Sequence, residues 1–328
     1  MHVSIIMPVY NSEQYLKRAL SSALQQKFKG ELEIIIVNDG SSDDSGSICR
    51  EYLAEFYDRL VYLEHKQNMG VSAARNTAMD LMRGDYFTFL DADDILPVNA
   101  IQEMYDLAED KQCDIVLGSI ARVYEDIELH KKTSKKHAII LDSDEGLIEL
   151  MNHKSMRGHV WGKLFKNKKN QKIQFSSDLR YAEDLHFCVG IFANSDLICV
   201  SDSSCYIYCQ HEQSTVHKKF ERFLYIDWTR SVELIGEKIE KVKLQKPYYR
   251  LKIKTIHQLV RELRFAKKNE SEHVIDHVNE KIRTWQITLM GLIRYRSLSL
   301  ANLLKIGQIN YILWRLSRKA LRNKGLGI

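Results

Sequence analysis

The stretch YFTFLDADD at residues 86–94 joins a short apolar run to three carboxylates. Residues 86–90 are typical of a buried β-strand, because the run is short, rich in aromatic residues and followed by polar turn residues. Asp91 and Asp93 are two residues apart at the carboxyl end of that strand, so their side chains are expected to point to one face. Ligands of open α/β sheets bind beyond the carboxyl ends of the strands. This position is therefore a candidate ligand site.

The sequence on either side of this stretch alternates between strand and helix patterns. Apolar, β-branched runs predict further strands at 3–8, 32–37, 60–63 and 114–118. Apolar residues at helical spacing predict helices between them, among them 71–82 and a first helix with Asn11 as its N-cap. Such alternation predicts an α/β fold with a mostly parallel sheet flanked by helices.

The second half of the chain divides into two regions. Residues 119–180 are less regular, and their basic cluster Lys131–Lys136 is expected to be a solvated loop or hairpin. A helix at 183–194 and a strand at 197–210 follow, and from Lys218 the pattern is helical and basic. We therefore expect one domain over 1–217, with halves 1–120 and 121–217, and a helical region over 218–328.

Composition limits the class of protein. The chain has 328 residues, of which 45% are hydrophobic and 28% charged, so a disordered or collagen-like protein is excluded. It contains no apolar run long enough for a transmembrane helix, and its N-terminus lacks the pattern of a signal peptide. Six cysteines without a C-x-x-C pair do not resemble a disulfide framework. A cytoplasmic location is expected.

Charge is distributed unevenly along the chain. Residues 1–217 contain 23 Lys and Arg against 33 Asp and Glu, whereas residues 218–328 contain 25 against 10. After Glu280 there are ten basic residues and no acidic one, and aromatic residues such as Trp285 are interspersed. This pattern favours peripheral contact with an anionic membrane surface, at the inner face of the cell membrane. The alternative is an amphipathic helix that packs on its own domain or on another subunit, as in a homo-oligomer. Nucleic acid is not expected as a partner, because no recognition motif is present.

The carboxylates and one arginine suggest the chemistry of the site. Asp91 and Asp93 would repel each other without a cation, so they favour a Mg²⁺ or Mn²⁺ ion that bridges to a diphosphate. The alternative is a solvated acidic turn. Asp39 follows the second strand, where it could accept a hydrogen bond from a nucleobase or serve as a helix N-cap. Arg75 lies in the first turns of a helix, which favours either a phosphate contact or an ion pair with Asp39 or Asp91.

Several motifs in this order resemble the family 2 glycosyltransferases of GT-A fold. They are VSIIMPVYN at 3–11, VNDGSSD at 37–43, N-x-G through the asparagine at 68–76, and DADD at 91–94. WGKLF at 161–165 and EDLHF at 183–187 resemble the acceptor-side motif of the family, with its Glu-Asp pair. The resemblance covers residues 1–120 and, less closely, 155–215.

This resemblance implies an inverting hexosyl- or N-acetylhexosaminyltransferase that uses a nucleotide-diphosphate sugar, of which a UDP-sugar is expected, together with Mn²⁺ or Mg²⁺. The acceptor would be a hydroxyl of a glycan or lipid-linked glycan in bacterial capsule, exopolysaccharide or O-antigen synthesis. The resemblance implies that Pro8, Tyr10 and Asp39 bind the base, that Arg75 and Asp91 lie at the ribose and diphosphate, and that Ala92 also contacts the nucleotide sugar. It implies metal binding by Asp93 and His211, general-base catalysis by Asp184, and acceptor contact by Trp161 and Glu183.

Other interpretations of these residues remain. His211 could be an ordinary surface histidine, and Cys199, Cys205 and Cys209 beside it could imitate a zinc site or simply pack in a strand. A nucleotidyltransferase would share a nucleotide-binding α/β sheet, but it needs a glycine-rich phosphate loop that residues 8–12 do not provide. A catalytically inactive glycan-binding or scaffold protein of the same fold is the remaining alternative.

Overall fold

The computed structural model describes residues 2–124, 138–152, 158–168, 173–211, 222–239, 242–262 and 268–285. The chain divides into two compact units, Met1–His217 and Lys218–Ile328, which are called unit 1 and unit 2 below. Each unit is described by itself.

Unit 1 is built on an eight-stranded sheet whose strands follow the order β3-β2-β1-β4-β7-β5-β8-β6. The strands are β1 (His2–Val9), β2 (Glu31–Asn38), β3 (Leu60–Glu64), β4 (Tyr86–Phe89), β5 (Ile115–Tyr124), β6 (Ala138–Asp142), β7 (Lys163–Lys166) and β8 (Leu197–Gln210). β1 pairs in parallel with β2 and β4, β2 with β3, and β5 with β8. β7 is antiparallel to β4 and β5, and β6 is antiparallel to β8. The expected α/β fold with a mostly parallel sheet is confirmed.

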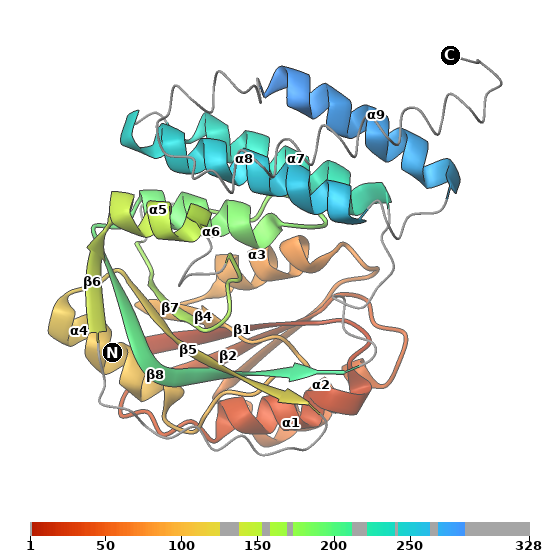
Figure 1. Ribbon diagram of the computed structural model, residues 1–328. Helices are drawn as coiled ribbons and strands as arrows, with labels where there is room; N and C mark the ends of the chain where they lie inside the picture. Colours follow the sequence, from red (N-terminus) through yellow and green to blue (C-terminus); the bar gives the residue numbers. More distant parts are fainter. Residues whose placement is uncertain are drawn as a thin grey trace, which may run out of the picture. The chain divides into compact units, whose positions relative to one another are not determined.

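Helices cover both faces of this sheet. They are α1 (Glu13–Leu24), α2 (Ser45–Glu55), α3 (Val71–Leu81), α4 (Ala100–Lys111), α5 (Ser143–Asn152) and α6 (Glu183–Ala193). Figure 1 shows α1 and α2 on one side of the sheet and α3, α5 and α6 on the other. The side chains of α4 share a core cluster with those of α1, so α4 lies on the α1 side.

The alternation of side chains along β1 and β4 explains these two layers. Ile5 and Met7 of β1 pack with residues of α1 and α4 in one core cluster. Phe87 and Phe89 of β4 point to the other face, where Phe89 contacts Phe187 of α6 edge to face at 5.8 Å. Because both faces of the central strands are buried, these strands are almost continuously apolar.

Most strands predicted from the sequence are present, but some local predictions were wrong. Asn11 does not cap α1, which has Ser12 as its N-cap. Asn11 instead has a φ of 46°, and its side-chain oxygen accepts a hydrogen bond from the backbone N–H of Ser42 at 2.9 Å. Residues 119–180 contain more regular structure than expected, because β5 extends to Tyr124 alongside β8 and β7 is inserted between β4 and β5. The predicted loop at Lys131–Lys136 lies outside the described residues.

Unit 2 contains α7 (Arg222–Glu237), α8 (Val242–Glu262) and α9 (Lys268–Thr284), which pack against one another. Their buried faces include Val232, Leu251 and Val278. Trp285 is 5% exposed, and its Nε1–H donates a hydrogen bond to Glu233 Oε1 at 3.3 Å. Trp285 therefore packs inside unit 2 and is not available as an interfacial ring, contrary to the sequence-based expectation. The remaining basic residues from 286 onward lie outside the described residues.

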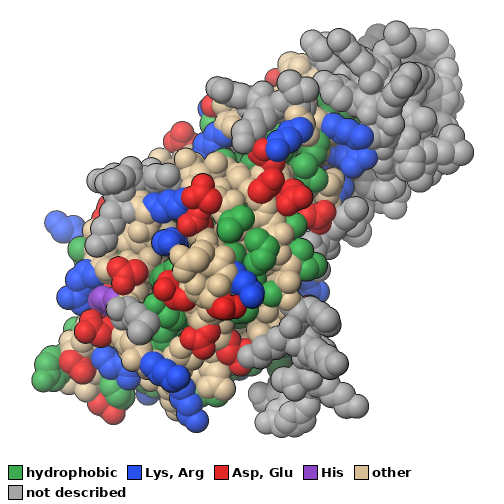
Figure 2. All heavy atoms as spheres, turned by 90° about the vertical axis from the view of Figure 1, so that its left-hand side faces the viewer, with side chains coloured by type: hydrophobic (Ala, Val, Ile, Leu, Met, Phe, Trp, Pro, Cys, Tyr) green, Lys and Arg blue, Asp and Glu red, His purple; other side chains and the backbone are tan. Residues whose placement is uncertain are grey.

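Surface and hydropathy give two further findings. In the part of the chain that the structure describes, no helix is long and apolar enough to cross a bilayer. On the face shown in Figure 2, acidic and basic side chains are interspersed among the described residues rather than separated by sign. The described side chains on that face therefore form no large patch of one charge.

Candidate functional site

The carboxyl ends of β1, β2 and β4 meet at one edge of the sheet. Val9 at the end of β1 is paired with Asn38 at the end of β2, and Ile6 of β1 is paired with Phe89 of β4. Residues that follow these strands therefore lie at neighbouring strand ends. The predicted donor-side residues Tyr10, Asp39 and Asp91 are brought to this edge in that way, which is where α/β proteins bind ligands.

Arg75 is the centre of a buried ion-pair cluster. Its side chain is 4% exposed, and Nη2 donates to Asp91 Oδ1 at 3.2 Å. Nη1 donates to Glu183 Oε1 at 3.1 Å and to Asp184 Oδ1 at 2.6 Å. Of the two ion pairs that the sequence allowed, the structure contains the one with Asp91. Arg75 also joins the loop after β4 to the start of α6, where Glu183 lies 108 residues after Arg75 in the chain.

Aromatic rings and backbone geometry fix this cluster in place. The Arg75 guanidinium carbon lies 5.2 Å from the ring centroid of Phe175 and 5.8 Å from that of Phe89. At this distance the ring faces attract the cation. Ala182, just before α6, has a φ of 59°, a left-handed conformation that costs a non-glycine residue about 1 kcal/mol or more. The turn at Ala182 directs Glu183 and Asp184 toward Arg75.

Burial and mutual repulsion change the protonation of this cluster. Burial, and then the charge of Asp184, raise the pKa of Glu183 to about 8, against the opposing effect of Arg75. Burial raises the pKa of Asp91 to about 6, although Arg75 again opposes the shift. Burial alone would lower the pKa of Arg75, but Asp184, Asp91 and Glu183 together raise it above its ordinary value. Arg75 is therefore a permanent cation, and the raised pKa of Glu183 favours its protonated form.

Glu183→Gln is expected to make the melting temperature less dependent on pH. The pKa of Glu183 is raised from 4.5 to about 8 in the folded protein, so between these values the folded state holds a proton that the unfolded state has lost. The stabilisation from this group is complete below pH 4.5 and is lost as the pH rises through about 8. A glutamine at this position has no such proton to lose, so the variant should melt about 3–6 °C above the wild type at about pH 9.

The measurement is calorimetric melting at about pH 6 and about pH 9. Glu55→Gln, at an exposed position at the end of α2, is the matched control and should leave the pH dependence unchanged. Equal pH slopes for the wild type and Glu183→Gln would contradict the raised pKa.

Asp39 is held by the loop between β3 and α3. Its two carboxylate oxygens accept hydrogen bonds from the backbone N–H groups of Met69 at 2.9 Å and Gly70 at 2.7 Å. Oδ1 also lies 2.7 Å from His65 Nδ1, and His65 Nε2 lies 3.0 Å from Thr77 Oγ1. The sequence did not predict His65 as a partner of Asp39. Asp39 is 3% exposed. Its hydrogen bonds to Met69 and Gly70 hold the loop that borders the proposed base site.

The glycine after Asp39 is required by close packing. Gly40 has a φ of 68°, and a Cβ atom added to it would lie 2.6 Å from the backbone carbon of Gln67. Only glycine therefore fits at this position of the turn, next to the loop that Asp39 holds. Tyr10, at the neighbouring strand end, is 49% exposed and leaves an aromatic ring open to a ligand.

Asp93 and His211 form the second polar pair of the site. His211 Nε2 lies 2.9 Å from Asp93 Oδ2, and the His211 ring stacks on Tyr15 of α1 with centroids 4.2 Å apart. Arg18, one turn later in α1, donates a hydrogen bond to the backbone carbonyl of Asp93 at 2.9 Å. The sequence suggested the Asp93–His211 pair through the family resemblance but did not identify Tyr15 or Arg18.

This pair fits a divalent cation only in part. Asp93 and His211 supply one carboxylate and one imidazole, and the described residues contain no group of three or more His, Cys, Asp or Glu side chains placed to hold a metal ion. A Mg²⁺-like ion commonly uses one or two protein ligands and completes its shell with water and substrate phosphates. The pair is compatible with an ion of this kind. Cys199, Cys205 and Cys209 are buried in β8, as strand packing predicts, and are not part of a zinc site among the described residues.

The two predicted acceptor-side residues, Trp161 and Glu183, have different surroundings. Trp161 is 8% exposed and is stacked between aromatic rings, with centroid distances of 4.1 Å to His159 and 5.4 Å to Tyr208. Glu183 belongs to the Arg75 cluster instead. Lys163, two residues after Trp161, is buried, which lowers its pKa, and its ammonium donates to the backbone carbonyl of His159. Of the remaining predicted residues, Pro8 is half-buried at the end of β1. Ala92 is buried in the loop after β4.

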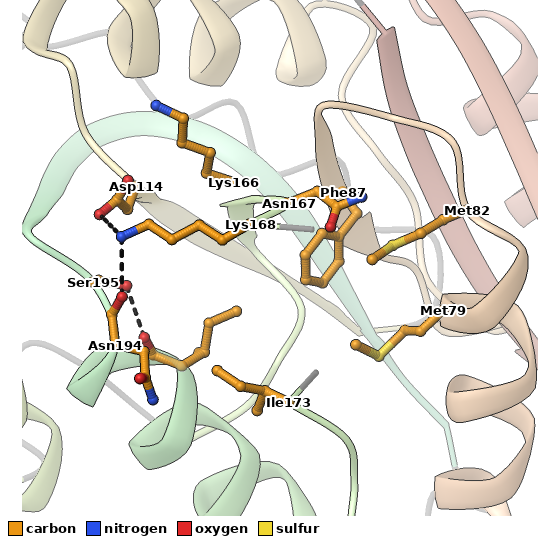
Figure 3. A pocket seen from close by; sticks show the side chains of 11 residues that line it. Met79, Met82, Phe87, Asp114, Lys166, Asn167, Lys168, Ile173, Asn194 and Ser195 are labelled. Carbon is orange, nitrogen blue, oxygen red and sulfur yellow. Dashed lines mark hydrogen bonds and ion pairs between the residues drawn. The ribbon is translucent and has the colours of Figure 1, made fainter. Parts of the chain in front are cut away.

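A surface pocket lies at the other end of the sheet. Met79, Met82 and Phe87 line its apolar side, and Asp114, Lys168 and Ser195 are among its polar residues. Figure 3 shows Lys168 extending across the pocket toward Asp114, which it contacts at 2.8 Å. Because Phe87 and Asp114 are near the amino ends of β4 and β5, this pocket is separate from the carboxylate cluster after β4.

Known proteins resemble this chain in sequence and in fold. Glycosyltransferase GlyA of Streptococcus pneumoniae is 33% identical over 63% of this chain and 30% of its own length. The poly(ribitol-phosphate) beta-glucosyltransferase of Bacillus spizizenii is 31% identical over 63% of this chain and 32% of its own length. The chain thus spans less than a third of either relative. A crystal structure of S. aureus TarS 1–349 in complex with UDP-GlcNAc has a TM-score of 0.58 at 19% identity, and the match covers 87% of this chain and 92% of that one.

The TarS match establishes the likeness of fold, and a family model provides the assignment. The model described as Glycosyl transferase family 2 matches residues 4–179, which is more than half of the chain. The matched region contains most of β1, all of β2 to β4, Asp39, Arg75 and the loop at Asp91–Asp94. The chain therefore belongs to glycosyl transferase family 2, with a GT-A type of fold.

Proposed function

We propose that this protein is an inverting, metal-assisted glycosyltransferase. It would transfer a hexosyl or N-acetylhexosaminyl group from a nucleotide-diphosphate sugar, a UDP-sugar, to a hydroxyl group of a glycan or lipid-linked glycan. The observation that carries this proposal is the Arg75 cluster. Arg75 contacts Asp91 at the proposed donor site and Asp184 at the proposed acceptor site, so one cation aligns both sides of the reaction.

Asp184 is the proposed general base. As the acceptor hydroxyl oxygen attacks the anomeric carbon, Asp184 would take its proton while the bond between that carbon and the diphosphate breaks. The nucleotide diphosphate would leave with the bonding electron pair, and a single displacement inverts the anomeric configuration. The 2.6 Å contact with Arg75 holds one oxygen of Asp184, and the other oxygen would face the acceptor hydroxyl. The raised pKa of Glu183 favours its protonated form, which would keep the charge of the cluster low.

Asp93 and His211 are the proposed ligands of the metal ion. When bound, Mn²⁺ or Mg²⁺ would neutralise the charge that develops on the leaving diphosphate. The donor set of one carboxylate oxygen and one imidazole nitrogen supports this assignment, because it leaves most of the coordination shell to water and phosphate oxygens. Arg18 beside Asp93 adds a positive charge next to the same region.

The donor and acceptor classes are supported by the relatives. TarS was crystallised with UDP-GlcNAc, and the B. spizizenii relative is named for its action on poly(ribitol phosphate). We propose that Pro8, Tyr10 and Asp39 border the base, with the exposed Tyr10 ring stacking on it, and that Ala92 lies beside the ribose. The product would be part of a bacterial surface polymer such as a capsule, an exopolysaccharide or a teichoic acid.

The basic end of the chain is the proposed membrane contact. Ten Lys and Arg residues and no acidic residue follow Glu280, which favours the anionic inner surface of the cell membrane. Trp285 is excluded from this contact because it is buried in unit 2. Sedimentation with anionic vesicles, with and without residues 286–328, tests this part of the proposal.

A panel of UDP-sugars tests the main proposal. The purified protein should release UDP from one or two members of the panel when Mn²⁺ or Mg²⁺ is present, and EDTA should abolish the release. The same donors should raise the melting temperature in a metal-dependent way, because a ligand that binds the native state stabilises it. Donor binding without any turnover would favour an inactive glycan-binding protein, and neither binding nor turnover would contradict the proposal.

A further inference from the structure

The third carboxylate of the DADD motif, Asp94, points away from the site and binds β8. Asp94 is fully buried, at 0% exposed. Its Oδ2 accepts a hydrogen bond from the Tyr206 hydroxyl at 2.7 Å, and its Oδ1 accepts one from the backbone N–H of Cys209 at 2.8 Å. Both carboxylate oxygens are therefore directed at β8, more than a hundred residues away in the sequence.

Tyr206 also contacts Asp91, the first residue of the DADD motif. Its hydroxyl oxygen accepts a hydrogen bond from the backbone N–H of Asp91 at 3.1 Å, while the hydroxyl hydrogen goes to Asp94. Ile95 and Ile207 add two backbone hydrogen bonds, of 3.1 Å and 2.9 Å. The term clasp is used below for Asp94, the Tyr206 hydroxyl and the Cys209 N–H.

The clasp lies beside the two proposed metal ligands, Asp93 and His211, in the sequence. Asp93 directly precedes Asp94, and His211 follows Cys209 by two residues. Because the clasp joins Asp94 to Cys209, it fixes the two backbones next to each other at the point where His211 Nε2 approaches Asp93 Oδ2 to 2.9 Å. The two proposed metal ligands come from distant segments, and the clasp is the buried polar connection beside them.

Direct metal binding by Asp94 does not fit this geometry. A metal ligand must present an oxygen to the cavity where the ion and the substrate meet, whereas the oxygens of Asp94 are buried and satisfied by β8. Residues that orient metal ligands through hydrogen bonds commonly change metal affinity about 10- to 100-fold when they are replaced.

We propose that Asp94 and Tyr206 are positioning residues that align Asp93 with His211 for the metal ion. This inference rests on the proposed function, because it assumes that these two residues hold the ion. In this proposal Asp93 binds the metal ion, and Asp94 holds the DADD loop against β8.

Tyr206→Phe is the sharpest test of the clasp. The variant removes the hydroxyl group and keeps the buried ring, which stacks on Trp161 with centroids 4.9 Å apart. Without the hydroxyl, Asp94 Oδ2 and the Asp91 N–H lose the partners described above, so the loop is held less firmly. We expect the affinity for Mn²⁺, measured by calorimetric titration with UDP present, to fall about tenfold or more.

Tyr208→Phe is the matched control. Tyr208 is on the same strand and its ring also stacks on Trp161. Its hydroxyl forms a hydrogen bond with the Gln210 side chain, and the carboxylates of the DADD loop act on it only through their charge. This variant should keep its Mn²⁺ affinity within about twofold of the wild type. Equal affinities in Tyr206→Phe and the wild type, or equal losses in both variants, would overturn the positioning role.

A readout without metal separates the clasp from the proposed function. Hydrogen–deuterium exchange on the metal-free protein should show faster exchange at Asp91 in Tyr206→Phe, because its N–H loses its acceptor, and no change in Tyr208→Phe. If the wild type itself does not bind Mn²⁺, the metal pair is wrong and the positioning role falls with it. If the wild type binds Mn²⁺ but Tyr206→Phe exchanges and binds normally, only the clasp is wrong.

Discussion

Asp184→Asn is expected to lower kcat about 100- to 10,000-fold with little change in fold. In the wild type, Arg75 donates a hydrogen bond of 2.6 Å to Asp184. The asparagine oxygen can still accept this hydrogen bond, but asparagine cannot take a proton from the acceptor hydroxyl. Losses of this size are typical when a general base is removed. The measurement is steady-state release of UDP with a donor that the wild type uses, in the presence of Mn²⁺.

Two further measurements make this prediction specific. Asp178→Asn alters an exposed carboxylate a few residues before α6 and should leave kcat within about twofold. The affinity of Asp184→Asn for UDP and Mn²⁺ should match that of the wild type, because the proposed base acts on the acceptor. Wild-type turnover by Asp184→Asn would show that another group accepts the proton.

Arg75→Met should lower the free energy of unfolding by about 3–5 kcal/mol. The change removes the only cation that the described residues place against Asp91, Glu183 and Asp184 together, and it leaves these partly buried carboxyl groups without a countercharge. Breaking a buried ion pair by removing one partner typically costs this much, because the desolvated charge that remains is not compensated. The free energy can be measured by urea unfolding at neutral pH.

Arg50→Met is the control for loss of an arginine on the surface. Arg50 pairs with Glu64 at 3.1 Å, but both side chains are about half exposed, so the loss should be about 0–1 kcal/mol. Adding Asp184→Asn to Arg75→Met should recover part of the lost stability, because it removes one of the uncompensated charges. If Arg75→Met is no more destabilising than Arg50→Met, the cluster does not hold the two sides of the site together.

The sequence was sufficient for the α/β fold class and for the family, whereas the roles of the candidate site residues stay predictions. Short apolar strands and intervening helices predict the α/β fold because side-chain periodicity reflects burial on each element. The position of Asp91 and Asp93 after β4, and of Asp39 after β2, follows from the same local pattern. The motif order then indicates the family. None of these inferences needs to know which residues meet across the fold.

The partners within the site required the tertiary structure. Arg75 and Asp184 are separated by 109 residues in the sequence, Tyr206 and Asp94 by 112, and His211 and Asp93 by 118. Local periodicity contains no information on such pairings. Asp91 and Asp39 were both reasonable partners for Arg75 from the sequence, and only the folded chain shows that Asp39 is occupied by His65 and the loop at Met69–Gly70.

The sequence by itself determined most elements of the first 120 residues and the residue types at the ends of their strands, because these depend on neighbours within a few positions. The tertiary structure alone decided that β7 enters between β4 and β5, that Arg75 contacts both Asp91 and Asp184, and that Asp94 binds β8. These features depend on desolvation and hydrogen-bond geometry between distant segments, which exist only when the core has closed around them.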